Sequence, residues 1–267
     1  MTNLSPPIFS IITCTYNSQD YLEQNILSVK KQKFKNYEHI FIDGDSKDNT
    51  IELIQNYQKD YPEIVKLFTR TPKGISNAFN EGIKESNGKY LIHLNSDDSF
   101  FDNNVLQKAY NFLIANDKLD WIYGKICVIN ESGKSLGTFS NKSIFQNNSL
   151  SAVGKYILKF INYIPHQAVF IKKTVFNRYG YFDESLSSKM DPDMWLRIKD
   201  NTQWSYFDCI VSNYMLRKGA MSSSKKNILV NKANLAIVQK RHLNRLEYII
   251  AILSNLLYKI KNRDFIK

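Results

Sequence analysis

The sequence predicts an α/β fold in which a mixed, mostly parallel sheet is flanked by helices, with a helical extension at the C-terminal end. Patterns typical of strands and helices alternate through the first hundred residues, as in doubly wound sheets. The apolar run 8–14 is typical of a central parallel strand that is buried on both faces. The strand 90–94 leads into a polar turn that contains Asp97 and Asp98, at the position where open α/β sheets bind ligands.

Length and composition limit the class of protein. The chain has 267 residues, 43% of them hydrophobic, which is enough for one large core or for one domain with an appendage. Its three cysteines are widely spaced and odd in number, so they predict neither a disulfide framework nor a zinc site and indicate a reducing compartment. Residues 1–7 lack a signal-peptide pattern, and the apolar run 248–253 is too short to span a bilayer. We therefore expect a cytoplasmic protein, and contact with the inner face of the plasma membrane stays open.

The net charge of +11, from 36 Lys and Arg against 25 Asp and Glu, predicts an anionic partner. Nucleic acid, anionic lipid and nucleotide phosphates all fit that description, and abundant lysine can also reflect an AT-rich genome. The chain carries no nucleic-acid-binding motif, so no nucleic acid is expected as its partner. It also lacks a glycine-rich phosphate loop and a dinucleotide fingerprint. We therefore expect the sheet to hold its ligand through carboxylates and a metal ion.

The first hundred residues divide into alternating strands and helices. The predicted helices carry apolar side chains at helical spacing, for example Leu22, Ile26 and Val29. In the last of these helices, Asn77 and Asn80 lie off the apolar stripe and either meet solvent or face a ligand cleft. The predicted strands are 8–14, 37–42, 64–68 and 90–94, and the predicted helices are 20–32, 51–59 and 73–83.

Past residue 100 the alternation weakens. A helix is predicted to open with Asp191 as its N-cap and Pro192 at its first position. Residues 142–161 show no clear pattern and are interpreted as a mobile loop, whereas residues 225–267 are basic and helical in pattern. The other predicted elements are a helix at 105–115, a hairpin formed by 121–128 and 136–139, and a strand at 165–171.

The adjacent carboxylates Asp97 and Asp98 have two interpretations. Mg²⁺ and Mn²⁺ prefer carboxylate oxygens and can hold a diphosphate at their remaining positions. Asn, Ser and Asp also end strands for purely local hydrogen-bonding reasons. This stretch alone does not separate a metal site from a turn.

The order of motifs over residues 8–200 resembles that of glycosyltransferase family 2, whose members use a nucleotide-sugar and the nucleotide-diphospho-sugar transferase (GT-A) fold. Each motif alone is weakly specific, but all six occur in the order of the family. They are SIITCTYN at 10–17, IDGDSKDNT at 42–50, KGISNAFNEG at 73–82, NSDD at 95–98, HQ at 166–167 and DPDMWLR at 191–197. The resemblance favours the metal-site interpretation and implies Mn²⁺ or Mg²⁺ as cofactor.

The resemblance also implies roles for individual residues. Donor binding is implied for residues in the first three motifs and in the acidic turn, whereas catalysis and acceptor binding are implied for residues in the last two. The implied roles are donor binding by Thr15, Tyr16, Asn17, Asp43, Asp45, Lys73 and Asp97, metal binding by Asp98, catalysis by Asp191 as the base, and acceptor-side contacts by His166 and Trp195.

Three positions depart from the family pattern. Gly44 stands where the family often has the second of two consecutive acids, so the usual base-contacting carboxylate is either missing or replaced by Asp45. The acidic turn is not a strict Asp-any-Asp, which leaves Asp98 as the expected metal ligand. Met190 precedes the expected base at a position where many relatives have an acid.

The implied reaction is a direct displacement that inverts the anomeric carbon, with a carboxylate as general base. Asp191 has an alternative role as a pure N-cap, whose hydrogen bonds would lower its pKa and make it a weaker base. His166 either lines the acceptor site, reaches the metal ion or belongs to a turn. Trp195 is either a core residue, which we favour, or a platform for the acceptor.

These observations predict a catalytic domain over 1–222, with a nucleotide-sugar half over about 1–100 and an acceptor half over about 101–222. The resemblance implies a metal-dependent hexosyltransferase that transfers a sugar from a nucleotide-diphospho-sugar, with UDP as the expected nucleotide. The expected acceptor is a saccharide or lipid-linked saccharide in bacterial capsule, O-antigen or exopolysaccharide synthesis. A catalytically inactive nucleotide-sugar-binding module of the same fold is the alternative. The basic amphipathic tail over 223–267 fits an anionic membrane surface, the catalytic domain or a second subunit in a homodimer.

Overall fold

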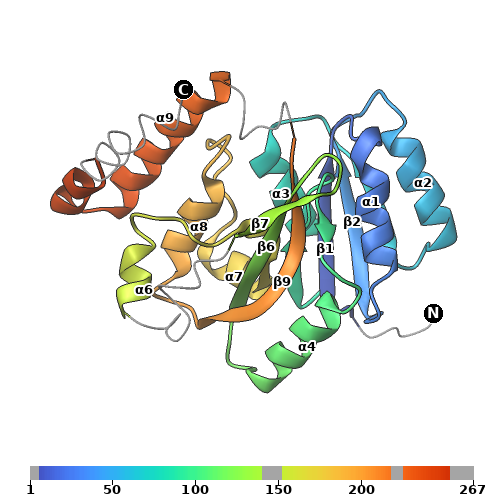
Figure 1. The fold of residues 1–267 in the computed structure, drawn as a ribbon, viewed down its shortest axis with the longest axis horizontal. Helices are drawn as coiled ribbons and strands as arrows, with labels where there is room; N and C mark the ends of the chain where they lie inside the picture. Colours follow the sequence, from blue (N-terminus) through green and yellow to red (C-terminus); the bar gives the residue numbers. More distant parts are fainter. Residues whose placement is uncertain (1–5, 140–151, 218–224, 253–267) are drawn as a thin grey trace.

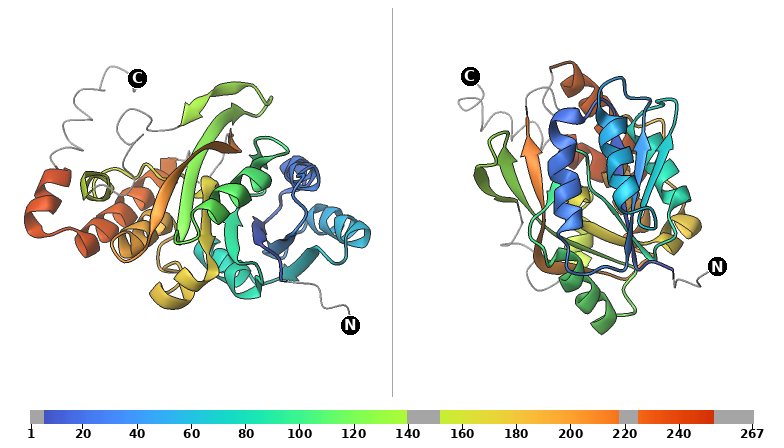
Figure 2. Two further views of the ribbon diagram at one scale, coloured as in Figure 1. Left: turned by 90° about the horizontal axis from the view of Figure 1, so that it is seen from below. Right: turned by 90° about the vertical axis from the view of Figure 1, so that its right-hand side faces the viewer.

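The computed structural model describes residues 6–139, 152–217 and 225–252, and these residues form a nine-stranded sheet with helices on both faces (Figures 1 and 2). The strand order is β3-β2-β1-β4-β8-β6-β9-β5, and β7 pairs with β6 outside this path. The strands are β1 (Phe9–Thr15), β2 (Tyr37–Asp43), β3 (Val65–Thr69), β4 (Tyr90–His93), β5 (Ser99–Phe100), β6 (Trp121–Asn130), β7 (Ser135–Phe139), β8 (Val169–Lys172) and β9 (Trp204–Leu216).

The first half of the sheet is parallel and the second half is mixed. β1 lies between β2 and β4 and pairs with both in parallel, and β2 pairs with β3 in parallel. β8 runs antiparallel to β4 and β6, whereas β9 runs parallel to β6. The predicted α/β fold is confirmed, and the four predicted strands of the first half begin and end within one residue of the observed ones.

Helices cover both faces because neighbouring strand residues point in opposite directions and both are apolar. Ile11 packs in the cluster with α4, and Ile12 packs against α3 on the other face; both are fully buried. The first face is covered by α1 (Gln19–Lys30), α2 (Thr50–Asp60) and α4 (Val105–Ala115), and the second by α3 (Ile75–Glu85), α7 (Lys173–Tyr179) and α8 (Met190–Ile198).

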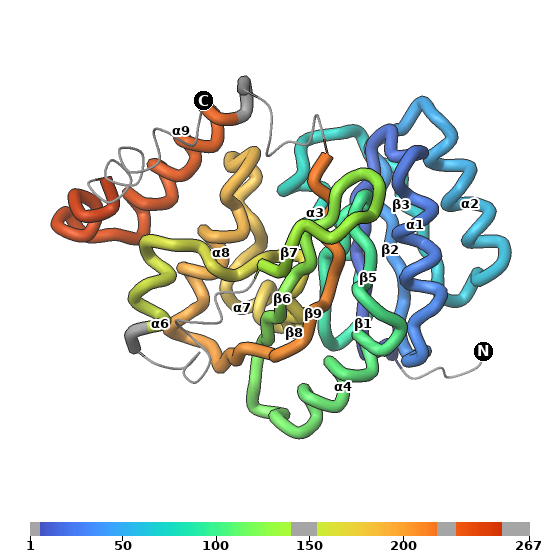
Figure 3. The backbone as a smooth tube through the Cα atoms, in the orientation of Figure 1, coloured from blue at the N-terminus to red at the C-terminus, as the bar shows by residue number. Residues whose placement is uncertain are grey.

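The helix α9 (Lys225–His242) lies at the opposite end of the molecule from α1 and α2 (Figures 1 and 3). It contacts α8, and its Val238 is 1% exposed and belongs to the same core cluster as α3 and α8. Its other aliphatic side chains do not form one stripe, because Leu229, Val230 and Ile237 are exposed. The helix therefore packs on α8 and the core of the preceding part of the chain, one of the alternatives that the sequence left open.

Several elements differ from the prediction. α8 begins at Met190 and its N-cap is Lys189, at φ +66°, so the prediction that Asp191 caps the helix is wrong. Asp191 is the second helical residue, and no side chain caps this helix end. The 13-residue strand β9 and the helix α7 were not predicted. Of the predicted loop 142–161, residues 142–151 lie outside the described part, while α6 (Ala152–Ile157) occupies part of the rest.

Within the described ranges, none of the helices combines the length and the apolar character that crossing a bilayer requires.

Candidate functional site

The strands β2, β1 and β4 end at one edge of the sheet, and polar side chains follow each of them. The register places Thr15 of β1 opposite Asp43 of β2, and Leu94 N donates to Ile12 O just after β4. The acidic turn, residues 95–98, therefore lies beside the turn that follows β1. Ser96 Oγ donates to Ser18 Oγ at 3.1 Å and links these two turns directly.

Asp43 joins the turns that follow β1 and β2. Its carboxylate accepts hydrogen bonds from Thr15 Oγ1 at 2.7 Å, Ser46 N at 2.8 Å and Ser46 Oγ at 2.7 Å, and it is fully buried. Asn17, at φ +47°, donates through its backbone N–H to Ser46 Oγ and accepts from Lys47 N. Asp43 and Asn17 thus fix the shape of this edge.

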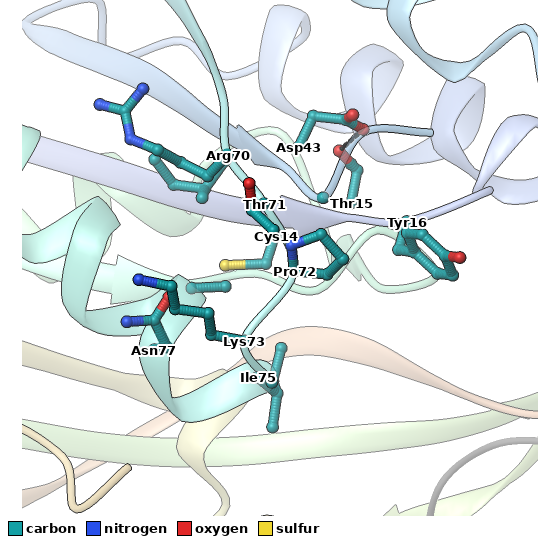
Figure 4. A pocket seen from close by; sticks show the side chains of 14 residues that line it. Cys14, Thr15, Tyr16, Asp43, Arg70, Thr71, Pro72, Lys73, Ile75 and Asn77 are labelled. Atoms are coloured by element: carbon teal, nitrogen blue, oxygen red, sulfur yellow. Dashed lines mark hydrogen bonds between the residues drawn. The ribbon is translucent and has the colours of Figure 1, made fainter. Parts of the chain in front are cut away.

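A cavity of about 240 Å³ opens beside these turns (Figure 4). Tyr16, Arg70 and Lys73 surround it together with Pro72, and the Tyr16 side chain is 60% exposed. Of the residues predicted to bind a donor, Thr15, Tyr16, Asp43 and Lys73 line the cavity. The full lining is Cys14, Thr15, Tyr16, Ile42, Asp43, Gly44, Arg70, Thr71, Pro72, Lys73, Gly74, Ile75, Asn77 and Ala78.

Asp45 is not among the residues that line this cavity. It has a left-handed backbone at φ +62°, is exposed, and forms an ion pair with Lys47 at 2.6 Å. Asn17 likewise does not line the cavity. The structure therefore separates the predicted donor-binding residues into a lining group and a second group in the neighbouring turns, formed by Asn17, Asp45 and Asp97.

The two carboxylates of the acidic turn have different surroundings. Asp98 is 1% exposed and accepts hydrogen bonds from Met215 N at 3.1 Å and Asn95 Nδ2 at 2.9 Å. Asp97 is half-buried and forms an ion pair with Arg217 Nε at 2.7 Å. Met215 belongs to β9 and Arg217 directly follows this strand, so the end of β9 completes the acidic turn.

Burial and the negative charge of Asp97 raise the pKa of Asp98 well above its usual range, although hydrogen bonds act in the opposite direction. A buried carboxylate of this kind is stabilised by a nearby cation. Its oxygen donors fit Mn²⁺ or Mg²⁺. In the described ranges, no three His, Cys, Asp or Glu side chains gather closely enough to form a complete metal site. Asp97 and Asp98 thus offer carboxylate oxygens but not a complete ligand set among the described residues.

Asn95 connects Asp98 to His166, which lies beside the second half of the sheet. The Asn95 amide nitrogen donates to Asp98 Oδ2 and lies 3.4 Å from His166 Nε2. His166 begins the short 3-10 helix η1 (His166–Ala168), and burial lowers its pKa although Asp191 and Asp97 act to raise it. His166 therefore lies close enough to Asp191 and Asp97 to interact with both electrostatically.

Asp191 lies in the first turn of α8. Its Oδ2 atom accepts a 3.3 Å hydrogen bond from Asn162 Nδ2, and the side chain is half-buried. Burial raises the pKa of Asp191, while His166 and Lys189 act to lower it. The carboxylate does not cap the helix, but hydrogen bonds from its own backbone N–H and from Asn162 also act to lower its pKa, and burial outweighs them.

Trp195 does not face an open site. It is 2% exposed and stacks on Trp121 with ring centroids 5.4 Å apart, which places it in the core. The sequence did not point to Asn95 as a bridge or to Arg217 as the partner of Asp97. Arg217 lies 120 positions along the chain from Asp97, and no local pattern marks such a contact.

Solved structures of sugar-transferring enzymes share this fold. The structure of S. aureus TarS 1–349 in complex with UDP-GlcNAc is similar with a TM-score of 0.66 and 22% identity, covering 86% of this chain and 66% of that chain. The mannosyltransferase PcManGT from Pyrobaculum calidifontis, solved in complex with GDP-Man and Mn²⁺, is similar with a TM-score of 0.61 and 14% identity, covering 96% and 78%. The chain therefore has the predicted nucleotide-diphospho-sugar transferase (GT-A) fold.

The family follows from the sequence comparison. The chain belongs to glycosyl transferase family 2, whose family model matches residues 10–173. An uncharacterized glycosyltransferase of Rickettsia felis is 30% identical over 198 residues, which are 73% of this chain and 32% of that protein. A PGL/p-HBAD biosynthesis glycosyltransferase of Mycobacterium bovis is 24% identical over 214 residues, covering 79% and 78%. The chain thus spans about a third of the length of the Rickettsia relative.

Proposed function

We propose that this chain is an inverting, metal-dependent glycosyltransferase that moves a sugar from a UDP-linked donor to a saccharide or lipid-linked saccharide. The main supporting observation is that the cavity of about 240 Å³ and Asp98 lie at the same edge of the sheet. Asn95 contacts both Asp98 and His166, and His166 interacts electrostatically with Asp191. The UDP-GlcNAc bound to TarS supports the choice of donor. The name of the Mycobacterium bovis relative supports a biosynthetic role.

The nucleotide would occupy the cavity. Tyr16 and Pro72 offer apolar surface to a base, and Arg70 and Lys73 place two cationic side chains near its ribose and phosphates. Asp43 would act indirectly, because its buried carboxylate holds Thr15 at the cavity wall.

Asp98 would bind Mn²⁺ or Mg²⁺, and the Mn²⁺ in the PcManGT complex supports this assignment. When bound, the ion would supply positive charge that offsets the charge on the departing diphosphate. Asp97 would face the ribose from the same turn, with its orientation held by Arg217. This arrangement makes donor binding dependent on the acidic turn.

Asp191 would remove the proton from the attacking acceptor hydroxyl. A base with a pKa raised by burial is better matched to that task at neutral pH than an ordinary carboxylate. The attack breaks the bond between the anomeric carbon and the diphosphate oxygen and forms the new glycosidic bond on the opposite face. An α-linked donor therefore yields a β-linked product.

A thermal-shift screen of nucleotide-sugars with Mn²⁺ identifies the donor, because a ligand that binds only the folded chain raises the melting temperature. Transfer is then measured with the labelled donor and candidate acceptors. Asp191→Asn should keep the donor-dependent shift and lose transfer. A wild-type chain that binds the donor but neither transfers nor hydrolyses it would support the inactive-module alternative.

We also propose contact between the C-terminal part and an anionic membrane, which would suit a lipid-linked acceptor. Residues 245–252 are helical, and Leu246, Ile249 and Ile250 are 67%, 46% and 43% exposed beside exposed basic residues such as Arg245. Wild-type protein should float with anionic vesicles and Leu246→Asp should float less. Ile114→Asp, at a 58% exposed site on α4, is the control. Equal flotation of all three proteins would contradict this contact.

A further inference from the structure

The turn that precedes the proposed base is held by the helix α3. Asn80 is 2% exposed, and its amide donates to Phe182 O at 2.9 Å and accepts from Phe182 N at 3.0 Å. The same amide donates to Glu184 Oε1 at 2.9 Å. Ser76, one helical turn earlier, donates to Leu186 O at 2.6 Å. These bonds connect α3 to residues 182–189, here named the 182–189 turn.

The same helix also forms part of the donor cavity. Ile75, Asn77 and Ala78 of its first turn line the cavity, and Asn77 Nδ2 donates to Glu184 Oε2 at 3.0 Å. Because a helix is a stiff element, the cavity wall and the bonds of Asn80 keep a fixed separation. Asn77 lines the cavity, whereas Asn80 is buried and does not, and both side chains bind the 182–189 turn.

The helix α9 holds the same turn from the other side. Asn234, which is 7% exposed, donates to Ser187 Oγ at 3.2 Å and to Ser188 Oγ at 3.1 Å. Arg241 pairs with Asp183 at the beginning of the turn. His242 Nε2 lies 2.9 Å from Asp193 Oδ1, just beyond the turn in α8. The turn is therefore fixed between two helices that lie far apart in the sequence.

We infer that Asn80 and Asn234 are positioning residues, which set the place of Asp191 relative to the donor cavity by clamping the 182–189 turn. Lys189 ends this turn with a left-handed backbone, and Asp191 follows two residues later. A shift of the turn would therefore move the base directly. This inference rests on the proposed function, since it assigns the base to Asp191.

Asn80→Ala in the full chain tests the α3 side. The variant leaves both backbone groups of Phe182 without their Asn80 partner, while the cavity lining stays unchanged. We expect kcat to fall by about 100-fold, since a misplacement of about 1 Å can cost that much, and the donor KM to change by less than about twofold.

Gln32→Ala is the matched control. Gln32 is also a buried amide, and it binds Ser28 O, Asp102 O and Leu106 N, which ties α1 to the start of α4. Its loss should lower the stability without lowering kcat. If Asn80→Ala keeps kcat within about twofold of this control, or loses only donor affinity, the inference is overturned.

Asn234→Ala tests the α9 side and should show the same fall in kcat with an unchanged donor KM. Hydrogen exchange of residues 182–191 should become faster in both Asn80→Ala and Asn234→Ala and stay at the wild-type rate in Gln32→Ala. Unchanged exchange in the first two variants would refute the clamp. Absence of transfer by the wild-type protein would refute the proposed function instead, and the exchange rates, which need no turnover, would still decide whether the clamp exists.

Discussion

Replacing Asp98 by Asn tests whether the acidic turn holds a metal ion. The side chain is 1% exposed and accepts hydrogen bonds from Met215 N and Asn95 Nδ2. Asp98→Asn keeps the size of the side chain but removes the charge and turns one acceptor oxygen into a donor. It therefore separates the loss of a cation ligand from the loss of packing.

Two effects on stability oppose each other in Asp98→Asn. Loss of one hydrogen bond to a charged acceptor costs about 1.5–3 kcal/mol. Burial and Asp97 raise the pKa of Asp98, so its ionised form is disfavoured in the folded chain and removal of the charge offsets part of this cost. We expect the free energy of unfolding to fall by about 1–2 kcal/mol at neutral pH.

The pH dependence has a defined sign. A carboxyl whose folded-state pKa is raised contributes stability at low pH that is lost as the pH rises through that pKa. The wild-type chain should thus lose stability relative to Asp98→Asn as the pH rises above about 4. Urea unfolding at a series of pH values measures this difference.

Metal binding should change far more than stability. We expect the Mn²⁺ affinity of Asp98→Asn to fall by at least about 100-fold, because even residues that only support a metal ligand can change affinity that much. Thermal shifts with Mn²⁺ and UDP measure this loss. Asp102→Asn, which removes a carboxylate paired with Lys108 on the surface, is the control. If Asp98→Asn kept the wild-type Mn²⁺-dependent shift and product formation, the assignment of the metal ligand would be wrong.

Three further predictions concern the base and the scaffold. Asp191→Asn should lower kcat by about 10²- to 10⁴-fold, and a variant with full kcat would exclude Asp191 as the base. Because burial raises the pKa of Asp191, wild-type kcat should begin to fall at a higher pH, as the pH is lowered, than an ordinary carboxylate would give. Glu38→Gln should cost about 2 kcal/mol at pH 7 in urea unfolding. Burial acts to raise the pKa of Glu38, but Lys66 and Ser10 outweigh it and lower the pKa. The difference in free energy of unfolding between the wild type and Glu38→Gln should therefore vanish as the pH falls through the lowered pKa. A difference that persists at low pH would show that the pairing is unimportant. Gly88→Ala should cost about 3 kcal/mol in the same assay, because a Cβ there would lie 2.5 Å from Ser10 N in β1, and a loss below about 1 kcal/mol would contradict this.

The parallel half of the fold was predictable because each strand is apolar enough to be buried on both faces. The long strand β9 was not, since Ser205, Asp208 and Asn213 interrupt its apolar pattern. Its pairing with β6 also shifts register beside Gly124, where an added Cβ would lie 2.6 Å from Cys209 O. Regular alternation fails as a signal where the register of a strand changes.

The site was predictable only in part for a related reason. Motif order brought Asp97, Asp98 and Asp191 to attention, but burial and hydrogen-bond partners decide what each carboxylate can do. The helix start was misplaced because Lys189 takes the N-cap position with a left-handed backbone, a conformation that its sequence does not suggest. The exposure of Asp45 and the burial of Asp43 likewise depend on how two distant turns meet.

The late position of β9 in the chain has a consequence for how the protein is made. Asp97 and Asp98 leave the ribosome more than a hundred residues before Arg217 and Met215, the groups that bind them. Until then, Asp97 lacks its ion-pair partner and Asp98 has Asn95 but not Met215 as a hydrogen-bond donor, so water must solvate much of this charge. Contacts over such separations form slowly. The site should therefore be among the last parts of the molecule to become ordered during synthesis.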